Sequence, residues 1–256
     1  MANEPDFQDK RLLRAHASGR RRLLVCFHHA GAGASIFIAW PKRLAALADV
    51  VLVQLQGRED RLAEPLEESL SKLSARIADE LSATAHDDIV LFGHSMGAII
   101  AWRVASRLWQ RHGRKTRVVL SAQSPQPLTL DLTWDTDMVS AWFNRLGEPL
   151  PAALQCAELR DIVVATLATD MAWMRREFVT PLPGPLPLDV FGLCADDDKL
   201  VTWELMSRWQ QYTTGLFALG SVPGGHLNII SRPDPILDFV YKLLTRDHDH
   251  APRLAA

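Results

Sequence analysis

Gly93-His94-Ser95-Met96-Gly97 is the stretch that decides the fold of this chain of 256 residues. The apolar run 89–92 leads into it and is typical of a buried strand, and the run 98–105 that follows is compatible with a helix. Glycines two residues either side of the serine predict a sharp strand-to-helix turn, because glycine has no Cβ to keep the two elements apart. Such a turn holds the serine hydroxyl at the edge of the sheet, beside a helix N-terminus that favours negative charge.

Short apolar runs alternate with helical patterns over most of the chain. The runs are continuously apolar, which is expected when both faces of a parallel sheet are covered. Strands are predicted at 23–27, 50–55, 89–92, 118–121, 188–193 and 216–219, and helices at 40–48, 66–83 and 98–112. This alternation predicts a mostly parallel, doubly wound α/β sheet, and with the G-x-S-x-G turn it predicts an α/β-hydrolase fold.

The segment 125–187 interrupts this alternation. It contains helical stretches at 137–146, 152–169 and 171–178, no strand-like run, and prolines near both edges. An ordinary crossover between two strands needs far fewer residues. We therefore expect one α/β-hydrolase domain over residues 1–256 with a helical cap, or lid, inserted at about 125–187.

Composition and charge exclude several classes of protein. The balance of 28 basic and 30 acidic residues offers no basic surface for nucleic acid or for an anionic membrane. Cys26, Cys156 and Cys194 are odd in number and widely spaced, which favours reduced thiols over disulfides or a metal site. The first 22 residues hold no apolar leader, and no apolar run reaches the length of a membrane span. We expect a soluble, cytoplasmic protein.

A histidine beyond the cap is expected to serve as general base. In this fold the nucleophile, the acid and the histidine follow one another along the chain, which makes Ser95 the nucleophile and restricts the base to later positions. His226 follows the predicted strand 216–219 and a pair of glycines, whereas His248 and His250 belong to the polar tail. We predict His226 as the base.

The acid should stand just after the predicted strand 188–193. Asp196, Asp197 and Asp198 all do, and spacing alone does not choose among them. One of them must be buried enough to orient the imidazole and stabilise its protonated form. Asp198 precedes Lys-Leu-Val and so resembles the D-x-x-V pattern in which the acid of these hydrolases often stands. We predict Asp198, with Asp196 as the main alternative.

An oxyanion hole needs two backbone N–H groups, and the sequence offers candidates for both. Met96, directly after the serine, supplies one. Ala30 is expected to supply the other, from the loop His28-His29-Ala30-Gly31-Ala32-Gly33 after an early strand. This loop has neither a dinucleotide-binding nor a Walker pattern, and its histidine pair lacks metal-ligand spacing, so no phosphate or metal site is predicted. His94, inside the turn, is expected to be structural.

Five short motifs spread over about residues 23–238 belong to one known pattern. They are the F-P-x-A-G-G loop as Phe27-His28-His29-Ala30-Gly31-Ala32, P-G-R-E as Gln56-Gly57-Arg58-Glu59, the elbow as Gly93-His94-Ser95-Met96-Gly97-Ala98, a cap aspartate in Leu167-Ala168-Thr169-Asp170, and Gly224-Gly225-His226. With them the chain resembles the type II thioesterases, the free-standing editing enzymes of polyketide and nonribosomal peptide assembly lines. The departures are His28, Ala32, Gln56 and Leu227, and none of them removes a catalytic group.

The resemblance implies a substrate, a partner and a chemistry. The partners would be acyl or peptidyl carrier protein domains, which hold acyl chains as thioesters on a phosphopantetheine arm. The enzyme would need no metal or organic cofactor of its own. Ser95 would attack the thioester, and His226 would take its proton. The amides of Met96 and Ala30 would stabilise the oxyanion before water releases the acyl group.

Trp142, Trp173 and Met174 in the cap are candidates for lining an acyl chamber, because the cap of this family covers the pocket. Arg58 and Glu59 are expected to form an ion pair within their own loop rather than to contact substrate. We expect a monomer, since no amphipathic stripe is left over.

The sequence is compatible with three other functions. A small-molecule carboxylesterase would use the same machinery without a carrier partner. A product-releasing or cyclising thioesterase would act on a finished chain, and it is disfavoured by the short lead-in without a carrier domain. A carrier-binding scaffold with an inactive site is disfavoured by the intact serine, aspartate and histidine.

Overall fold

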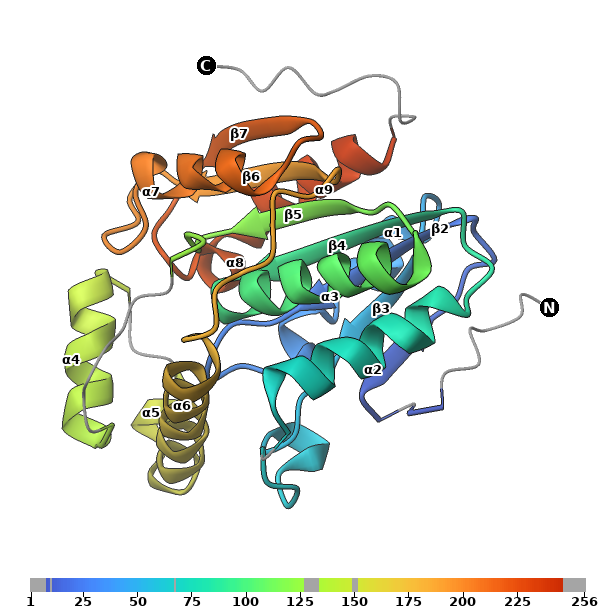
Figure 1. Cartoon of the computed structure of the whole chain (residues 1–256). Coiled ribbons are helices and arrows are strands. Elements are labelled where there is room, and N and C mark those ends of the chain that lie inside the picture. The colour runs from blue at the N-terminus through green and yellow to red at the C-terminus, as the bar shows by residue number, and fades with distance from the viewer. Residues whose placement is uncertain (1–7, 10, 67, 127–133, 149–151, 246–256) are drawn as a thin grey trace.

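The computed structural model describes residues 8–9, 11–66, 68–126, 134–148 and 152–245. Its centre is a seven-stranded sheet with the order β1-β3-β2-β4-β5-β6-β7 (Figure 1). The strands are β1 (Leu13–His16), β2 (Arg22–Phe27), β3 (Asp49–Val53), β4 (Asp88–His94), β5 (Arg117–Ser121), β6 (Asp189–Ala195) and β7 (Phe217–Val222). The edge strand β1 pairs antiparallel with β3, and the other five pairings are parallel. The predicted mostly parallel sheet is confirmed.

Helices cover both faces of the sheet, and consecutive residues of one strand contact opposite layers. The helices of the two layers are α1 (Trp40–Leu44), α2 (Leu70–Ser82), α3 (Met96–His112) and α9 (Pro233–Leu244). In β4, Ile89 and Leu91 join the apolar cluster that includes α2 and α3, whereas Val90 and Phe92 join the one that includes α1 and α9. This explains why the strands are continuously apolar in sequence.

Short elements connect the sheet to these layers and escaped prediction from the sequence. They are the 3₁₀ turns η1 (Ala34–Phe37), η2 (Glu59–Arg61) and η3 (Arg208–Tyr212), and the helices α7 (Trp203–Ser207) and α8 (Asn228–Ser231). Strand β1 was missed as well, because its four residues are partly polar and lie at the edge of the sheet. Each of these elements is too short to show a periodic pattern.

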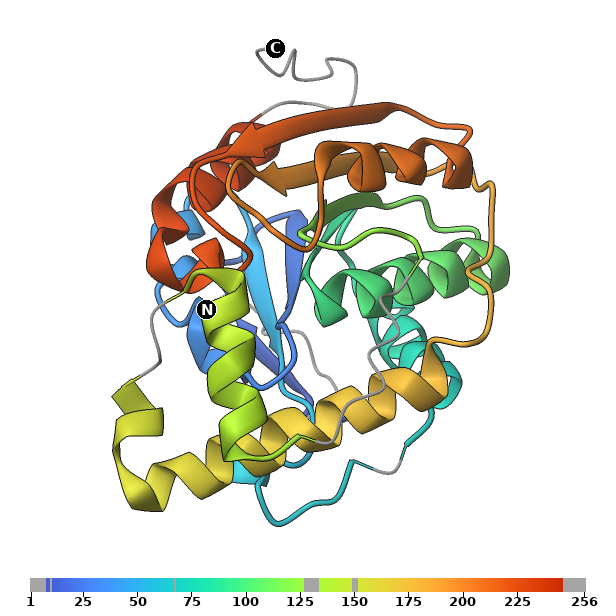
Figure 2. The ribbon, with the colours of Figure 1, turned by 90° about the vertical axis from the view of Figure 1, so that its left-hand side faces the viewer.

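Three helices of the predicted cap lie together at one end of the sheet. They are α4 (Thr136–Leu146), α5 (Ala152–Gln155) and α6 (Ala157–Glu177). Figure 2, seen from that end, shows α4 crossing the long helix α6 beside the strand ends. Residues from all three helices share an apolar cluster with Leu227. The parts of the predicted cap at 127–133 and 149–151 lie outside the described residues, as does the tail after Thr245 with His248 and His250.

One difference from the sequence prediction concerns α6. We expected helical stretches at 152–169 and 171–178, but α6 runs without interruption through Asp170, and the break between helices lies at Cys156 instead. The carboxylate of Asp170 is fully buried and has partners, so it interrupts neither the helix nor its packing. Within the described part of the chain, no helix is long and apolar enough to cross a membrane.

Candidate active site

Ser95 occupies the strained turn that the G-x-S-x-G pattern predicted. Its φ of 52° and ψ of −120° lie outside the regions that L-residues ordinarily adopt. The turn is possible because glycines flank it: a Cβ at Gly93 would overlap the backbone of Gly97 and Ala98, and a Cβ at Gly97 would overlap the carbonyl of Phe27. The N–H of Ser95 donates to the carbonyl of Ser121 at 2.9 Å, which fixes the turn against the neighbouring strand β5.

The structure brings Ser95, His226 and Asp198 into one hydrogen-bonded line. The Oγ of Ser95 lies 3.1 Å from Nε2 of His226. The Nδ1 of His226 lies 2.9 Å from Oδ2 of Asp198. With the proton on Nδ1 donated to the carboxylate, Nε2 is free to accept the proton of the serine hydroxyl. This is the arrangement that a serine nucleophile needs.

Among the three aspartates after β6, Asp198 alone is buried, while Asp196 and Asp197 are exposed. The second oxygen of Asp198, Oδ1, accepts the backbone N–H groups of Leu200 at 2.8 Å and Val201 at 3.1 Å. These bonds fix the orientation of the carboxylate that meets His226. The main alternative, Asp196, is exposed, and it is Asp198 that bonds to the imidazole of His226.

His94 supports the hydrogen-bonded residues Ser95, His226 and Asp198 without being one of them. Its Nε2–H donates to the backbone carbonyl of His226 at 2.8 Å, and its Nδ1 accepts from the hydroxyl of Ser121 at 3.0 Å. Burial, and then the nearby His29 and His226, hold the pKa of His94 well below its usual range. His94 therefore stays neutral and structural.

The loop after β2 carries Ala30 beside the serine. Ala30 and Gly31 line the same cavity as Ser95 and His226, and Met96 begins helix α3 directly after the serine. Gly31 has a φ of +78°, a conformation that favours glycine. The loop therefore lies where a second backbone amide could act with that of Met96.

Side chains of the segment after β3 accept hydrogen bonds from the backbone of the residues that follow in this loop. The side-chain oxygen Oε1 of Gln54 accepts the N–H of Ala34 at 2.6 Å, and Oε1 of Glu59 accepts the N–H of Ser35 at 3.2 Å. Gln54 is fully buried, and its amide nitrogen donates to the carbonyl of Arg58. Sequence reasoning missed Gln54, although a polar residue at the end of a buried strand could have drawn attention to it.

The expected ion pair between Arg58 and Glu59 is wrong. Arg58 instead reaches helix α6, where Nη1 and Nη2 donate to the two oxygens of Asp170 at 2.6 Å each. The side chains of Arg58 and Asp170 are 3% and 0% exposed. Glu59 turns away because its carboxylate accepts the amide of Ser35 and lies 3.7 Å from Arg14.

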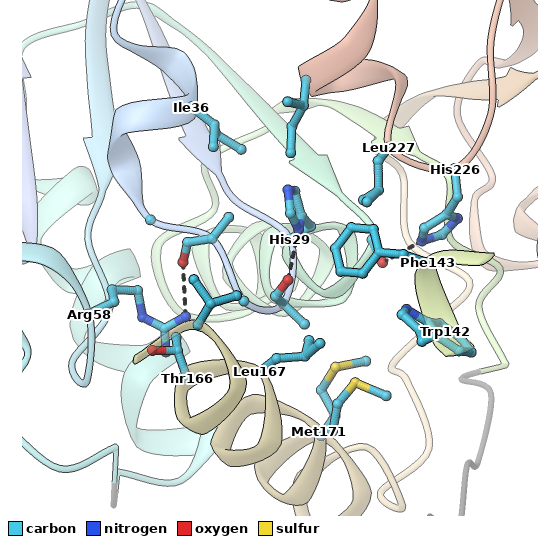
Figure 3. A pocket seen from close by; sticks show the side chains of 18 of the residues that line it. His29, Ile36, Arg58, Trp142, Phe143, Thr166, Leu167, Met171, His226 and Leu227 are labelled. Atoms are coloured by element: carbon cyan, nitrogen blue, oxygen red, sulfur yellow. Dashed lines mark hydrogen bonds between the residues drawn. The ribbon is translucent and has the colours of Figure 1, made fainter. Parts of the chain in front are cut away.

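A cavity of about 350 Å³ opens beside Ser95 and His226. Figure 3 shows Trp142 and Phe143 from α4 close to His226, with Leu167 and Met171 from α6 further along the cavity. The wall is mainly apolar, and Met174 and Val163 extend it along α6. An acyl chain bound to the serine would find apolar surface on the side of these helices.

Two of the three cap candidates lie in this wall, and one does not. Trp142 and Met174 line the cavity. Trp173 is 1% exposed and packs against Phe178 in the main core, with its indole N–H donating to the carbonyl of Glu68 at 2.8 Å. Neighbouring positions of a helix point about 100° apart, so Met174 faces the cavity while Trp173 faces the core.

The paired histidines of the loop are held by carbonyls. Nδ1 of His28 donates to the carbonyl of His29 at 2.9 Å, and Nδ1 of His29 donates to that of Ala30 at 2.8 Å. Burial lowers the pKa of His29 to about 4 and that of His28 well below its usual range. Among the described residues, no group of three or more histidine, cysteine or acidic side chains is placed to hold a metal ion.

Comparison with known proteins adds to this geometry. The sequence matches the protein family described as "Thioesterase domain" over residues 22–244. A relative from Streptomyces griseus, "Probable cadicidin biosynthesis thioesterase", is 33% identical over 217 residues, which cover 83% of this chain and 60% of that protein. "Thioesterase PikA5" from Streptomyces venezuelae is 32% identical over 208 residues, which cover 79% of this chain and 74% of that protein.

Solved structures are similar over most of the chain. RedJ, a thioesterase from the prodiginine biosynthetic pathway in Streptomyces coelicolor, aligns with a TM-score of 0.76 and 30% identity, covering 88% of this chain and 91% of RedJ. BorB, a type II thioesterase from the borrelidin biosynthetic cluster, aligns with a TM-score of 0.76 and 28% identity, covering 91% of this chain and 97% of BorB. The predicted α/β-hydrolase fold and the predicted resemblance to type II thioesterases are confirmed.

Proposed function

Because the chain belongs to the thioesterase family, we propose that it is an editing enzyme of polyketide or nonribosomal peptide synthesis. It hydrolyses stalled or aberrant acyl groups from the phosphopantetheine arm of acyl or peptidyl carrier proteins. The observation that carries this proposal is the line from Ser95 through His226 to Asp198, which opens onto an apolar cavity. Relatives named as thioesterases, one of them as a biosynthesis thioesterase, support the reaction and its biosynthetic setting.

The reaction proceeds through an acyl-serine. Ser95 Oγ attacks the thioester carbonyl while Nε2 of His226 takes the hydroxyl proton, and Asp198 stabilises the imidazolium that forms. The C–S bond then breaks, and His226 returns the proton to the departing thiol of the carrier. Water next attacks the acyl-serine with the same histidine as base, and the products are a carboxylic acid and free Ser95.

The oxyanion that forms twice in this cycle is stabilised by backbone N–H groups. We assign them to Met96, at the start of α3, and to Ala30, in the loop after β2. Donors that are fixed before the reaction are worth more than water, because they need no reorganisation as charge develops. A thiolate is a good leaving group, so the remaining demand is lower than for an amide. Each step uses groups of the chain and water.

Helices α4, α5 and α6 form the cap over this site in our proposal, within the inserted segment 125–187. Trp142 and Met174 line the acyl chamber on the cap side. A carrier protein delivers its arm to the open side of the cavity, and the acyl chain lies against the cap. The monomeric state and the cytoplasmic location remain predictions.

The experiment that tests this function is intact-mass spectrometry of acyl carrier proteins incubated with the purified protein. Acetyl, propionyl, butyryl and longer acyl groups are compared, with Ser95→Ala as the control. We expect rapid loss of the acyl group from the carrier, dependent on Ser95. Hydrolysis of aryl esters without any loss from carriers would instead indicate a small-molecule carboxylesterase. Release of a cyclic product would indicate a cyclising thioesterase, and carrier binding without turnover an inactive scaffold.

A further inference from the structure

Asp170 lies in the middle of helix α6 and connects it to the loop that carries Ala30. Its Oδ2 accepts the backbone N–H of Gly31 at 2.7 Å. Both of its oxygens also accept from the guanidinium of Arg58, at 2.6 Å each. The aspartate is 0% exposed, so none of these bonds competes with solvent. A carboxylate on a proposed cap helix thus binds the main chain next to the proposed oxyanion donor.

The peptide between Ala30 and Gly31 is held at both of its ends. Its N–H donates to Asp170, and its carbonyl oxygen accepts from Nδ1 of His29 at 2.8 Å. A peptide held by these two bonds resists rotation about the bond that joins it to the Cα of Ala30. The direction of the Ala30 N–H, on the other side of that Cα, is thereby restricted too. Arg58 adds a third constraint by donating to the carbonyl of Ala32 at 3.0 Å.

Charge explains why a carboxylate can serve here. A lone buried carboxylate near the site of a developing oxyanion would oppose the negative charge of the reaction. The guanidinium of Arg58 pairs with Asp170 through two parallel bonds, so the pair carries no net charge. The loop therefore gains a strong, fixed acceptor for Gly31 without a net charge that would oppose catalysis.

We propose that Asp170 is a positioning residue that makes the oxyanion hole dependent on helix α6. When α6 is docked, Asp170 holds the Gly31 amide and the loop directs the Ala30 N–H at the reacting carbonyl. When α6 moves away, Gly31 loses its acceptor and the second oxyanion donor loses its fixed direction. This inference rests on the proposed function, because it gives Ala30 a part in thioester hydrolysis.

A matched pair of double variants isolates the acceptor from the charge. Arg58→Gln is introduced in both, so that neither protein holds an unpaired buried arginine. Asp170→Asn in this background keeps an oxygen that can accept the Gly31 N–H. Asp170→Leu has nearly the same shape and volume but no acceptor. Any difference between the two proteins then reports the bond to Gly31 rather than the ion pair.

We expect the Asp170→Leu/Arg58→Gln protein to hydrolyse acyl-carrier thioesters with a kcat at least about tenfold below that of the Asp170→Asn/Arg58→Gln protein. Loss of a whole oxyanion donor costs roughly 10²- to 10³-fold, and a misdirected donor costs part of that. KM should change by less than about twofold, since the acceptor acts on the transition state. With asparagine in place of leucine at position 170, most of the lost kcat should return.

Binding measurements provide a readout that loss of stability alone would not move. A trifluoromethyl ketone analogue of the acyl group forms a tetrahedral adduct with Ser95 and needs the oxyanion donors. A thioether analogue, which cannot react, does not need them. The Asp170→Leu/Arg58→Gln protein should bind the ketone more weakly in proportion to its loss in kcat/KM, and it should bind the thioether as the matched control does.

Equal kcat values and equal ketone affinities in the two folded double variants would overturn the inference. Thermal unfolding confirms that each protein is folded. If the leucine change prevents folding, Asp170→Ala in the same background replaces it. Hydrogen exchange of the Gly31 amide in the unaltered protein is an independent check, and rapid exchange would also overturn the inference. A chain without any Ser95-dependent hydrolysis would fail the proposed function instead, which is a separate result.

Discussion

The Nε2 atom of His94 lies 2.8 Å from the backbone oxygen of His226, so the histidine inside the serine turn supports the histidine proposed as general base. The segments that carry these residues are 132 positions apart in the chain. The rings are 6.0 Å apart between their centres. Burial keeps the pKa of His94 low, which makes it a neutral donor to this carbonyl at all ordinary pH values. The turn that holds Ser95 therefore also helps to position His226.

Replacing His94 by phenylalanine should impair both stability and turnover. The change leaves the buried carbonyl of His226 without its donor, and an unsatisfied buried group costs about 1–3 kcal/mol. The loop of His226 should also shift, and a shift of about 1 Å can cost up to roughly 10²-fold in rate. We expect kcat to fall by about tenfold or more. His94→Gln can still donate to this carbonyl and should retain most of the activity. The acyl-carrier assay measures turnover of both variants, and denaturant unfolding measures their stability.

The stability of the protein should fall as the pH is lowered from about 6.5 towards 4. Burial lowers the pKa values of His28, His29 and His94 in the folded protein, that of His29 from 6.5 to about 4. The unfolded chain therefore binds protons in this window that the folded protein does not bind, and its free energy falls relative to the native state as the pH falls.

Each such histidine contributes about 1.4 kcal/mol per pH unit to this slope. Urea unfolding between pH 7.5 and 4.5 measures it, above the range in which Asp49 and Asp88, whose pKa values are lowered, lose their charge. Asn in place of His29 should remove about one proton from the slope. An unfolding free energy that is constant between pH 6.5 and 4.5 would contradict the assignment of these histidines as neutral in the folded state.

Asp198→Asn should lower kcat by roughly 10³- to 10⁴-fold, because the amide can no longer hold the imidazole of His226 in the required tautomer. Asp196→Asn should leave kcat within about twofold, since that side chain is exposed. The acyl-carrier assay measures both with the same substrate. A severe loss in the Asp196 variant with little loss in the Asp198 variant would reverse the assignment of the acid.

Gly97→Ala should prevent folding or leave the protein unstable. The added Cβ would overlap the backbone carbonyl of Phe27, a rigid neighbour that cannot move without separating β2 from α3. Gly113→Ala is the control. Gly113 caps α3 with a φ of 63° and has open space around it, so that change costs only the left-handed conformation, about 1–2 kcal/mol. Thermal unfolding of the two proteins separates overlap from conformation.

The sheet and the line of catalytic candidates could be predicted because their signals are local. Each of the six predicted strands is an apolar run of its own, and the turn at Ser95 and the loop of His226 follow such runs. In a parallel sheet the loops after the strands meet at one edge, so chain order alone brings the serine, the acid and the histidine together. The burial that separates Asp198 from Asp196 depends on the fold.

Other features depend on partners that are distant in the sequence. Arg58 and Asp170 are 112 residues apart, so the arginine could not be distinguished from one paired with the adjacent glutamate. The side-chain oxygen of Gln54 accepts the N–H of Ala34, 20 residues away, and no sequence pattern indicates this bond. The direction of Trp173 was missed for a related reason: α6 contacts the core on one face and the cavity on another, so its apolar residues do not reveal which face they serve.

Trp142→Ala and Met174→Ala should shift the preference of the enzyme towards longer acyl chains. Both side chains line the cavity beside Ser95, and their truncation adds volume to the acyl side of the site. Trp173→Phe is the matched control on the same helix as Met174. Trp173 lies in the core outside the cavity wall, so this change should lower the unfolding temperature without altering chain preference.

Competition among acetyl, butyryl, hexanoyl and octanoyl carriers, followed by intact-mass spectrometry, gives the ratios of kcat/KM. We expect the octanoyl-to-butyryl ratio to rise by about tenfold, since one methylene of apolar contact is worth about 1–3 kcal/mol, or roughly tenfold or more in kcat/KM. An unchanged ratio in both cavity variants would remove α4 and α6 from the acyl chamber, and a changed ratio in the Trp173 variant would place the specificity in the core packing of α6 instead.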